Sequence, residues 1–302
     1  MQIMTVLGPI EPGLLGFTNA HEHLLSDLYH ESRSLDGVMN DEDLIVEELA
    51  ILKAAGGSAL VEVTNRGLGR QPEALRRIAL ATGLHIVMGC GWYRQKFYDE
   101  TIDRTRTDDL AADMVQDLTR GADGTGIRAG VIGEIGSDKG YITAAEERVL
   151  RAAARASRET NAAITTHAVC HPLGIEQLDI LEQEGVKPTR VIIGHCDSYL
   201  RLDYHEAIAR RGAYVEYDTF GKRQIYSDER RIAMLAELLR RGYETRILLS
   251  TDVCLRSNLH AYGGPGYDHL ISRVVPALRV AGISEQQIHL MTVTNPARVL
   301  AF

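Results

Sequence analysis

The sequence is poor in cysteine and has no long apolar run. Its four cysteines among 302 residues, Cys90, Cys170, Cys196 and Cys254, have neither CxxC spacing nor the density of a disulfide scaffold. We therefore expect reduced thiols in a cytoplasmic protein. No segment approaches the roughly 20 apolar residues that a membrane span needs. The start, "MQIMTVLGPI", lacks the positive charge that opens a signal peptide, so we expect none.

Positive charge is also scarce. The formal net charge is -8, and no basic run occurs. This excludes nucleic acid and anionic membrane as expected partners and leaves small molecules. The chain also lacks a linker, a low-complexity tract and a fixed-period repeat. With 45% apolar residues it can bury a large core, and we expect one domain over residues 1–302.

Short apolar, β-branched runs are abundant, and they alternate with helix-like stretches such as "PEALRRIALATG" and "AAEERVLRAAARASRET". A capping box of Ser284 and Gln287 predicts the start of a last helix. Apolar strands alternating with helices indicate a parallel sheet covered on its outside. Eight such units in this length predict an α/β fold, the (β/α)8 TIM barrel. The eight runs span residues 14–20, 58–64, 84–90, 129–135, 162–168, 190–196, 213–219 and 246–252.

Residues of metal-ligand type lie at the ends of five of these runs. They are His21 and His23, Glu134, His167, His195 and Asp252. In a barrel the strand ends share one rim, where active sites lie. Because residues i and i+2 of a strand face the same side, His21 and His23 point together into the barrel mouth and Glu22 points away. Imidazole and carboxylate groups together suit zinc or a similar ion.

Other interpretations apply to single residues. A lone histidine at a strand end is usually a hydrogen-bonded structural residue, but six ligand-type side chains at one rim favour a metal site. For most of the remaining histidines we expect structural roles; these are His171, His205, His260, His269 and His289. The cysteines at strand ends, such as Cys196 beside His195, should face the other way and pack in the barrel wall.

Several motifs together resemble the phosphotriesterase-related proteins of the amidohydrolase superfamily, and most of all their phosphotriesterase homology branch. They are "NAHEHL", "GEIGSD", "THAVCHPLGIEQL", "IGHCDSYL", "YVEYDTFGK" and "STDVCLRSNLHAYGGPGYDHL". The resemblance implies a TIM barrel with two divalent metals, zinc in the first place, with manganese or iron as alternatives. It also implies a metal-dependent hydrolase in which a hydroxide bridges both ions.

By the same resemblance, each metal would have its own ligands. His21, His23 and Asp252 would hold the more buried metal, and His167 and His195 the more exposed one. Glu134 would bridge them where many phosphotriesterases have a carboxylated lysine. Asp252 would also be the catalytic base.

Two departures argue against organophosphate triesters as the substrate. One is Glu134 in place of the carboxylated lysine. The other is Thr219, which follows Asp218 where those triesterases have a histidine implicated in proton transfer.

Loop residues are the remaining clue to the substrate. Lys222 follows the seventh strand and Arg256 the eighth; we expect both to face the metals and to hold an anionic group, although they could equally be loop charges paired with nearby acids. Tyr93 and Trp92, after the third strand, could wall the pocket. The glycine-rich loop over residues 260–269 is interpreted as a pocket rim or a subunit contact.

The sequence thus predicts a binuclear hydrolase of a small anionic ester or lactone, including a phosphorylated sugar lactone, that forms a homodimer. An amidase of N-acyl amino acids or N-acyl taurine is the alternative. A phosphotriesterase, or a barrel that binds metal or ligand without catalysis, is a weaker one.

Overall fold

Eight parallel strands form the centre of the protein in a computed structural model that describes all 302 residues. They follow one another in chain order around the sheet, each paired with the next. The strands are β3 (Thr18–Glu22), β6 (Ala59–Glu62), β7 (His85–Cys90), β8 (Val131–Gly136), β9 (Ile164–His167), β10 (Val191–Ile193), β11 (Tyr214–Tyr217) and β12 (Ile247–Leu249). Each of the eight expected runs therefore overlaps one strand, and the sheet is a nearly closed (β/α)8 barrel of one domain.

The seam between β3 and β12 closes the barrel. The amide of Asp252 donates to the carbonyl of His21 at 3.2 Å, and the amide of His23 donates to the carbonyl of Val253 at 3.1 Å. The Ser250 hydroxyl adds a bond to the His21 carbonyl at 2.7 Å. The first and last strands are thus tied together at the end where the candidate ligands lie.

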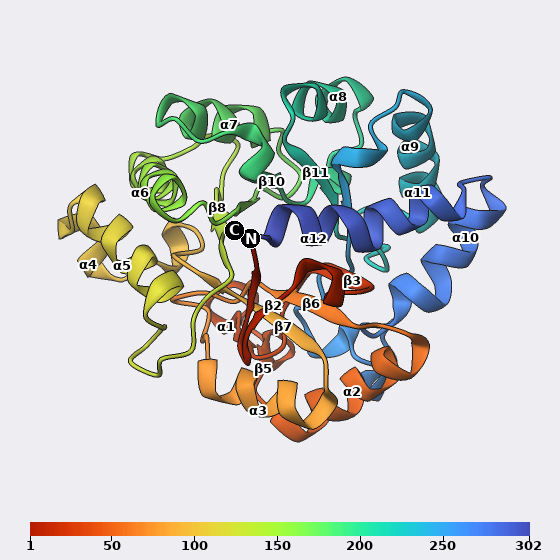
Figure 1. Cartoon of the computed structure of the whole chain (residues 1–302), viewed down its shortest axis with the longest axis horizontal. Helices are drawn as coiled ribbons and strands as arrows, with labels where there is room; N and C mark the ends of the chain where they lie inside the picture. The colour runs from red at the N-terminus through yellow and green to blue at the C-terminus, as the bar shows by residue number, and fades with distance from the viewer.

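Helices surround the sheet and connect successive strands (Figure 1). The main ones are α2 (Glu42–Ala55), α3 (Pro72–Thr82), α5 (Thr107–Thr119), α6 (Ala144–Thr160), α7 (Gly174–Gln183), α8 (Leu202–Arg211), α9 (Asp228–Arg240), α10 (Val275–Val280), α11 (Glu285–His289) and α12 (Asn295–Leu300). Short helices α1 (Tyr29–Ser32) and α4 (Glu100–Arg104) lie in the loops, and small sheets are formed by β1 (Ile3–Thr5) with β2 (Gly8–Ile10) and by β4 (Ser26–Asp27) with β5 (Val38–Met39). None of these helices combines the length and apolar character that a bilayer-spanning helix needs.

Local sequence explains several helix boundaries. The Ser284–Gln287 capping box is present at the start of α11, as the sequence predicts. Proline explains the two wide turns η9 (Leu270–Val274) and η10 (Leu290–Thr294), which precede Pro276 and Pro296. A proline has no N–H for the helical ladder, so the helix widens just before it.

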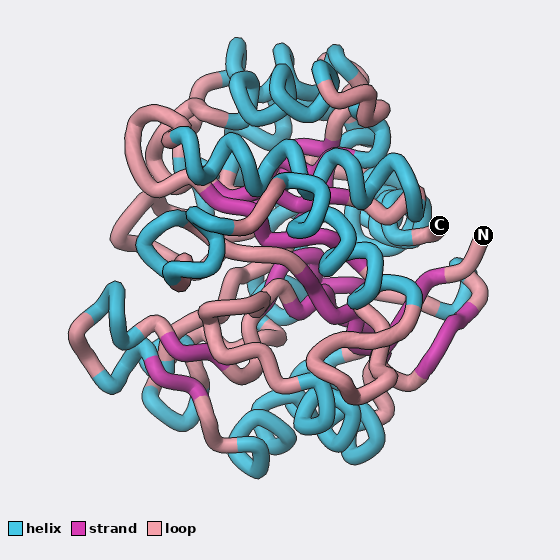
Figure 2. The backbone as a smooth tube through the Cα atoms, turned by 90° about the vertical axis from the view of Figure 1, so that its left-hand side faces the viewer, coloured by secondary structure: helices cyan, strands magenta, loops and turns pink.

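The core has two layers, inside and outside the sheet. Inward-facing strand residues such as Val61 and Leu248 form a cluster of 15 buried residues, which Ile3 and Leu300 close at the N-terminal end of the barrel. A second cluster of 64 buried residues fills the space between sheet and helices. Figure 1 shows α12 across the middle of the ring with both termini beside it, and Figure 2 shows the strands stacked between layers of helix. The opposite end of the barrel is left for a site.

Strand boundaries differ from the expected runs. The run over 14–20 begins too early, since Pro12–Leu14 forms a short helical turn and β3 starts at Thr18. His195 lies two residues beyond the end of β10, and Asp252 lies three residues beyond the end of β12. These side chains therefore reach the rim through the first residues of loops.

Candidate metal centre

Glu134 lies between four imidazoles at the C-terminal end of the barrel. Its Oε2 lies 2.9 Å from His167 Nδ1, 3.3 Å from His21 Nε2 and 3.4 Å from His195 Nε2. Its Oε1 lies 3.4 Å from His23 Nε2. All five side chains are buried. The barrel thus places one carboxylate at the centre of four ring nitrogens.

Asp252 completes the cluster and faces two ways. Its Oδ1 lies 3.5 Å from His23 Nε2 and 3.9 Å from His21 Nε2. Its Oδ2 accepts a short hydrogen bond from the Lys222 ammonium. One carboxylate oxygen is therefore available to a metal and the other faces the loop that carries Lys222.

The ligand atoms fall into overlapping groups in which all atoms lie within 4.8 Å of one another. One group is His21, His23 and Asp252, and another is Glu134, His167 and His195. Two adjacent groups of three such donors could hold two divalent ions, with Glu134 between them.

Hydrogen bonds fix which ring nitrogen faces the cluster. In three histidines Nδ1 is held by a neighbour: His21 by Glu216 at 3.1 Å, His23 by Thr64 at 2.8 Å and His195 by Asp218 at 2.8 Å. Such partners orient a metal-binding imidazole and leave Nε2 for the metal. His167 is the exception, because its Nδ1 faces Glu134 and His195 Nε2, the latter at 2.7 Å.

The charges around His21 fit a bound cation. His21 Nε2 is buried and has no hydrogen-bond partner in the chain. Burial disfavours the imidazolium, but Asp218, Glu134 and Glu216 outweigh it and raise the pKa of His21 well above its usual value. Likewise, burial opposes the charge of Glu134, yet His167, His195 and His21 hold the pKa of Glu134 well below its usual value. The cluster is thus built to bind positive charge, and its donor set fits divalent metals.

Glu22 points away from the cluster and ties the barrel seam. Its carboxylate accepts bonds from Ser250 Oγ at 2.8 Å, from both the amide and the hydroxyl of Thr251, and from the Val253 amide at 2.7 Å. Asn19 Nδ2 donates a fifth bond at 2.9 Å. The acid between the two histidines is therefore a fully bonded structural carboxylate.

Two cluster residues have left-handed backbone conformations. His195 has φ 54° and Asp252 has φ 49°. Non-glycine residues seldom adopt this conformation, and functional sites are where it is retained. The Asp218 carboxylate holds His195 in place by accepting from its amide at 2.8 Å as well as from its ring.

A pocket of about 270 Å³ opens onto the cluster. Tyr93 lines it, with its hydroxyl 3.2 Å from His167 Nε2. Lys222 lines it too. Burial disfavours the Lys222 ammonium, but Asp252 and Cys254 outweigh this and raise the pKa of Lys222. The sequence therefore identified two residues of the pocket wall correctly by position.

Arg256 and Trp92 lie elsewhere, contrary to the sequence-based expectation. Arg256 donates from Nε to the Val38 carbonyl at 2.6 Å and from Nη2 to Asn40 at 3.1 Å, so it holds β5 and does not line the pocket. Trp92 packs in the outer core beneath the Arg66 guanidinium. The direction of a side chain on a loop depends on contacts that no sequence pattern encodes.

The sequence did not indicate several residues of the pocket wall, among them Cys254 and Arg94. Cys254, for which the sequence predicted only a reduced thiol, lines the pocket with Sγ 3.2 Å from Lys222 Nζ. Arg94 also lines the pocket, stacked 4.7 Å above Tyr93 and bound to Glu31 at 3.0 Å and to Asp138. Its place directly after Tyr93 was the available signal.

The carboxylates of Glu216, on β11, and of Asp218, directly after it, were also missed as partners of the cluster. Glu216 and Asp218 alternate with apolar residues in "YVEYD", so both point into the barrel. Two acids at i and i+2 on a buried strand need partners, and this alternation was the signal that could have revealed them.

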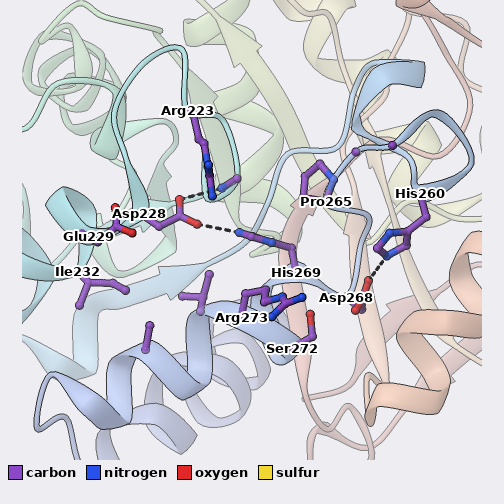
Figure 3. A pocket seen from close by; sticks show the side chains of 15 residues that line it. Arg223, Asp228, Glu229, Ile232, His260, Pro265, Asp268, His269, Ser272 and Arg273 are labelled. Atoms are coloured by element: carbon purple, nitrogen blue, oxygen red, sulfur yellow. Dashed lines mark hydrogen bonds and ion pairs between the residues drawn. The ribbon is translucent and has the colours of Figure 1, made fainter.

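The glycine-rich loop over 260–269 borders a second, larger cavity of about 820 Å³ (Figure 3). There His269 Nε2 lies 2.7 Å from Asp228, which also accepts from the Gly221 amide at 2.9 Å. Gly221 has φ +89°, and a Cβ there would meet Pro265 at 3.1 Å. The loop that carries Lys222 into the metal pocket is thus fastened on its other side in this cavity.

The chain is similar to proteins of one family along its whole length. The model of the phosphotriesterase family matches residues 1–300. The chain is 39% identical to the phosphotriesterase homology protein of Escherichia coli, covering 94% of this chain and 97% of that protein. It is 33% identical to the N-acetyltaurine hydrolase of Xenopus tropicalis, covering 100% and 98%.

Solved structures agree with this similarity. The crystal structure of the Escherichia coli protein, complexed with phosphate in its active site, has a TM-score of 0.93 and covers 95% of this chain and 99% of that one. A lactonase from Listeria monocytogenes has a TM-score of 0.96 at 30% identity, covering 100% of this chain and 99% of that one.

Proposed function

Since the chain belongs to the phosphotriesterase family, whose members are metal-dependent hydrolases acting on ester bonds, we propose that it hydrolyses a small anionic ester or lactone. Two divalent metals, zinc in the first place, would be held by the two ligand groups. His21, His23 and Asp252 form one group and Glu134, His167 and His195 the other, and Glu134 Oε1 lies 3.4 Å from His23 Nε2 of the first group, so Glu134 would serve both ions. The observation that carries the proposal is the central Glu134 carboxylate, surrounded by four imidazoles at the base of a pocket.

The residues of the chain divide the remaining work. Bound divalent metals supply a nucleophile from water near neutral pH and polarise the substrate oxygen. Asp252 Oδ2 faces the pocket and is the atom that accepts the proton of the attacking water and passes it to the leaving group. Tyr93 closes the wall beside His167 and excludes bulk water.

Pocket size and charge support a small anion. A volume of about 270 Å³ lies just below the usual range of ligand pockets, which begins at roughly 300 Å³. The Lys222 ammonium stands at the wall next to Asp252. When Asp252 also serves a metal through Oδ1, it neutralises Lys222 less completely. Lys222 can then attract a carboxylate, phosphate or sulfonate.

Triester hydrolysis is less well supported. The residue at the position of the triesterase histidine, Thr219, uses its hydroxyl to donate to Asp197 at 2.8 Å and to accept from Arg231 at 2.7 Å. A hydroxyl bound on both sides cannot accept and release a proton as an imidazole does.

An amidase of N-acyl amino acids or N-acyl taurine is the second candidate. The specific observation in its favour is the similarity to N-acetyltaurine hydrolases over the full length of this chain. A sulfonate or carboxylate near Lys222 and an acyl carbonyl at the cluster would suit the same pocket.

The test has two steps. Protein purified without added metal is analysed for metal, and turnover of a neutral aryl ester is measured with and without chelator. About two metals per chain and chelator-sensitive turnover are expected. A metal content near zero that reconstitution cannot raise would overturn the proposal. Anionic lactones, N-acyl amino acids, N-acetyltaurine and a triester are then compared by kcat/KM, and the best substrate class decides between the candidates.

A further inference from the structure

Glu216 is a buried carboxylate with an incomplete set of partners. It lies on β11, and its side chain has no exposed surface. Its Oε2 accepts from His21 Nδ1 at 3.1 Å, while its Oε1 is buried and has no partner. Burying a charged group in this state costs several kcal/mol. The bond to His21 is the one hydrogen bond of this side chain, and we infer that it offsets little of the cost to the fold.

Glu22 shows what a structural carboxylate looks like in the same barrel. It is equally buried, but it accepts five hydrogen bonds and joins β3 to the segment after β12. The side chain of Glu216 bonds only to the ring of His21. The two acids therefore differ in function: Glu22 stabilises the fold, whereas the side chain of Glu216 bonds to one histidine.

Neighbouring groups do not replace Glu216 at His21. Asp218 Oδ2 lies 3.5 Å from His21 Nδ1, which is long for a hydrogen bond, and Asp218 already accepts from the amide and the ring of His195. His23, from the same strand as His21, is held by the neutral hydroxyl of Thr64. In the group of His21, His23 and Asp252, His21 is therefore the one histidine whose Nδ1 is held by a carboxylate.

We propose that Glu216 is a positioning residue that sets the affinity of the metal group formed by His21, His23 and Asp252, and that it contributes nothing to the stability of the metal-free fold. This inference rests on the proposed binuclear function. A carboxylate acceptor at Nδ1 fixes the ring and makes Nε2 a stronger donor. The effect should be confined to one metal, because none of the residues of the group Glu134, His167 and His195 bonds to Glu216.

The test is a series of substitutions in the full-length protein, Glu216→Gln and Glu216→Met. Glutamine keeps an acceptor for Nδ1 but loses the charge, and methionine loses both. Glu48→Gln is the matched control, since Glu48 is also buried but accepts only from the amides of His260 and Ala261. Zinc retained per chain is measured after dialysis against graded chelator, and thermal unfolding of the metal-free proteins is measured alongside.

Glu216→Met should lose one of the two zinc ions at about ten- to a hundred-fold lower chelator strength, with the second ion retained as in the wild type. The zinc retention of Glu216→Gln should lie between those of Glu216→Met and the wild type, and the zinc retention of Glu48→Gln should match the wild type. The metal-free Glu216 variants should unfold at the wild-type temperature or above it. Equal retention of both ions in Glu216→Met, or a lower unfolding temperature of the metal-free Glu216 variants, would overturn the inference. A wild-type protein that binds no zinc would overturn the proposed function as well. This outcome differs from failure of the Glu216 inference alone, in which the wild type still binds zinc.

Discussion

Asp252 divides its two carboxylate oxygens between the cluster and the pocket. Oδ1 faces the imidazoles of His21 and His23, and Oδ2 faces Lys222. We predict that Asp252→Asn lowers kcat by about 100-fold or more, the size of a lost general base, because an amide cannot accept the proton. The amide oxygen can still coordinate, so at least one metal should remain. Kinetics together with metal analysis check this, and near-normal turnover would show that Asp252 is not the base.

Lys222 and Arg256 were expected to act together, and the structure separates them. Lys222→Met should lower kcat/KM about ten- to a hundred-fold for the true anionic substrate, since a charge-assisted hydrogen bond contributes about 1.5–3 kcal/mol. A neutral aryl ester should lose less, because it loses only the effect of the Lys222 bond on Asp252.

Arg256→Ala provides the comparison for Lys222, because Arg256 only holds Val38 and Asn40. Any loss in Arg256→Ala should be the same for both substrates. A selective loss for the anionic substrate in Arg256→Ala, or an equal loss for both in Lys222→Met, would contradict these assignments.

Ligand-type residues were predictable from the sequence, whereas their supports were not. His21, His23 and Glu134 lie at or next to strands, where alternation fixes the side-chain direction. Arg256 lies on a loop, so its direction depends on a distant carbonyl of β5. Glu216 was readable in principle, since an acid inside a buried strand demands a partner.

At the scale of an element, the loop between β11 and α9 lines two cavities. Lys222 lines the metal pocket, whereas Gly221 and Arg223 line the larger cavity (Figure 3). Asp228, at the start of α9, fastens this loop by accepting from the Gly221 amide and from His269. This fastening helps to hold Lys222 at Asp252, together with the bond from Arg231 Nη2 to the Lys222 carbonyl at 3.1 Å.

We predict that Asp228→Ala lowers kcat/KM for the anionic substrate about tenfold. The loop would move and displace Lys222, which positions the substrate, while the catalytic groups stay in place. Amide hydrogen exchange over residues 219–226 should speed up in the same variant. Glu229→Ala is the control, since Glu229 occupies the same first turn of α9 and lines the same cavity but holds no loop amide. Unchanged exchange in Asp228→Ala would show that the loop is held by other contacts.

Element types were predictable from the sequence to a greater degree than element ends. Eight apolar runs became eight strands because each is buried on both faces. Their ends moved for two reasons. Pro12–Leu14 forms a local turn where a strand was expected, and the left-handed residues His195 and Asp252 depend on bonds to Asp218 and His21.

At the scale of the whole molecule, the metal cluster joins the two ends of the chain. His21 comes from the first barrel strand, and Asp252 follows the last. The seam that unites them depends on Glu22 and Ser250. A complete cluster therefore requires a closed barrel, and barrel stability is a condition for function.

One buried histidine outside the cluster makes that stability depend on pH. His205 Nε2 donates to the carbonyls of Cys196 at 2.8 Å and Tyr199 at 3.1 Å, and Nδ1 accepts from the Tyr217 hydroxyl at 2.8 Å. The neutral ring is therefore fully bonded. Burial lowers the pKa of His205 from 6.5 to about 4, although the two carbonyls partly oppose the shift.

The sign of the pH effect follows from this shift. Between pH 6.5 and about pH 4 the unfolded chain binds a proton at His205 and the folded protein does not. Stability from this residue is thus fully present above pH 6.5 and is lost as the pH falls, by at most about 1.4 kcal/mol per pH unit. We predict that His205→Gln shows a shallower loss of unfolding free energy over this window than the wild type. Urea unfolding of chelator-treated protein at several pH values measures the slopes. His289→Gln, at an exposed position, should keep the wild-type slope, and equal slopes in wild type and His205→Gln would show that His205 does not cause the acid sensitivity.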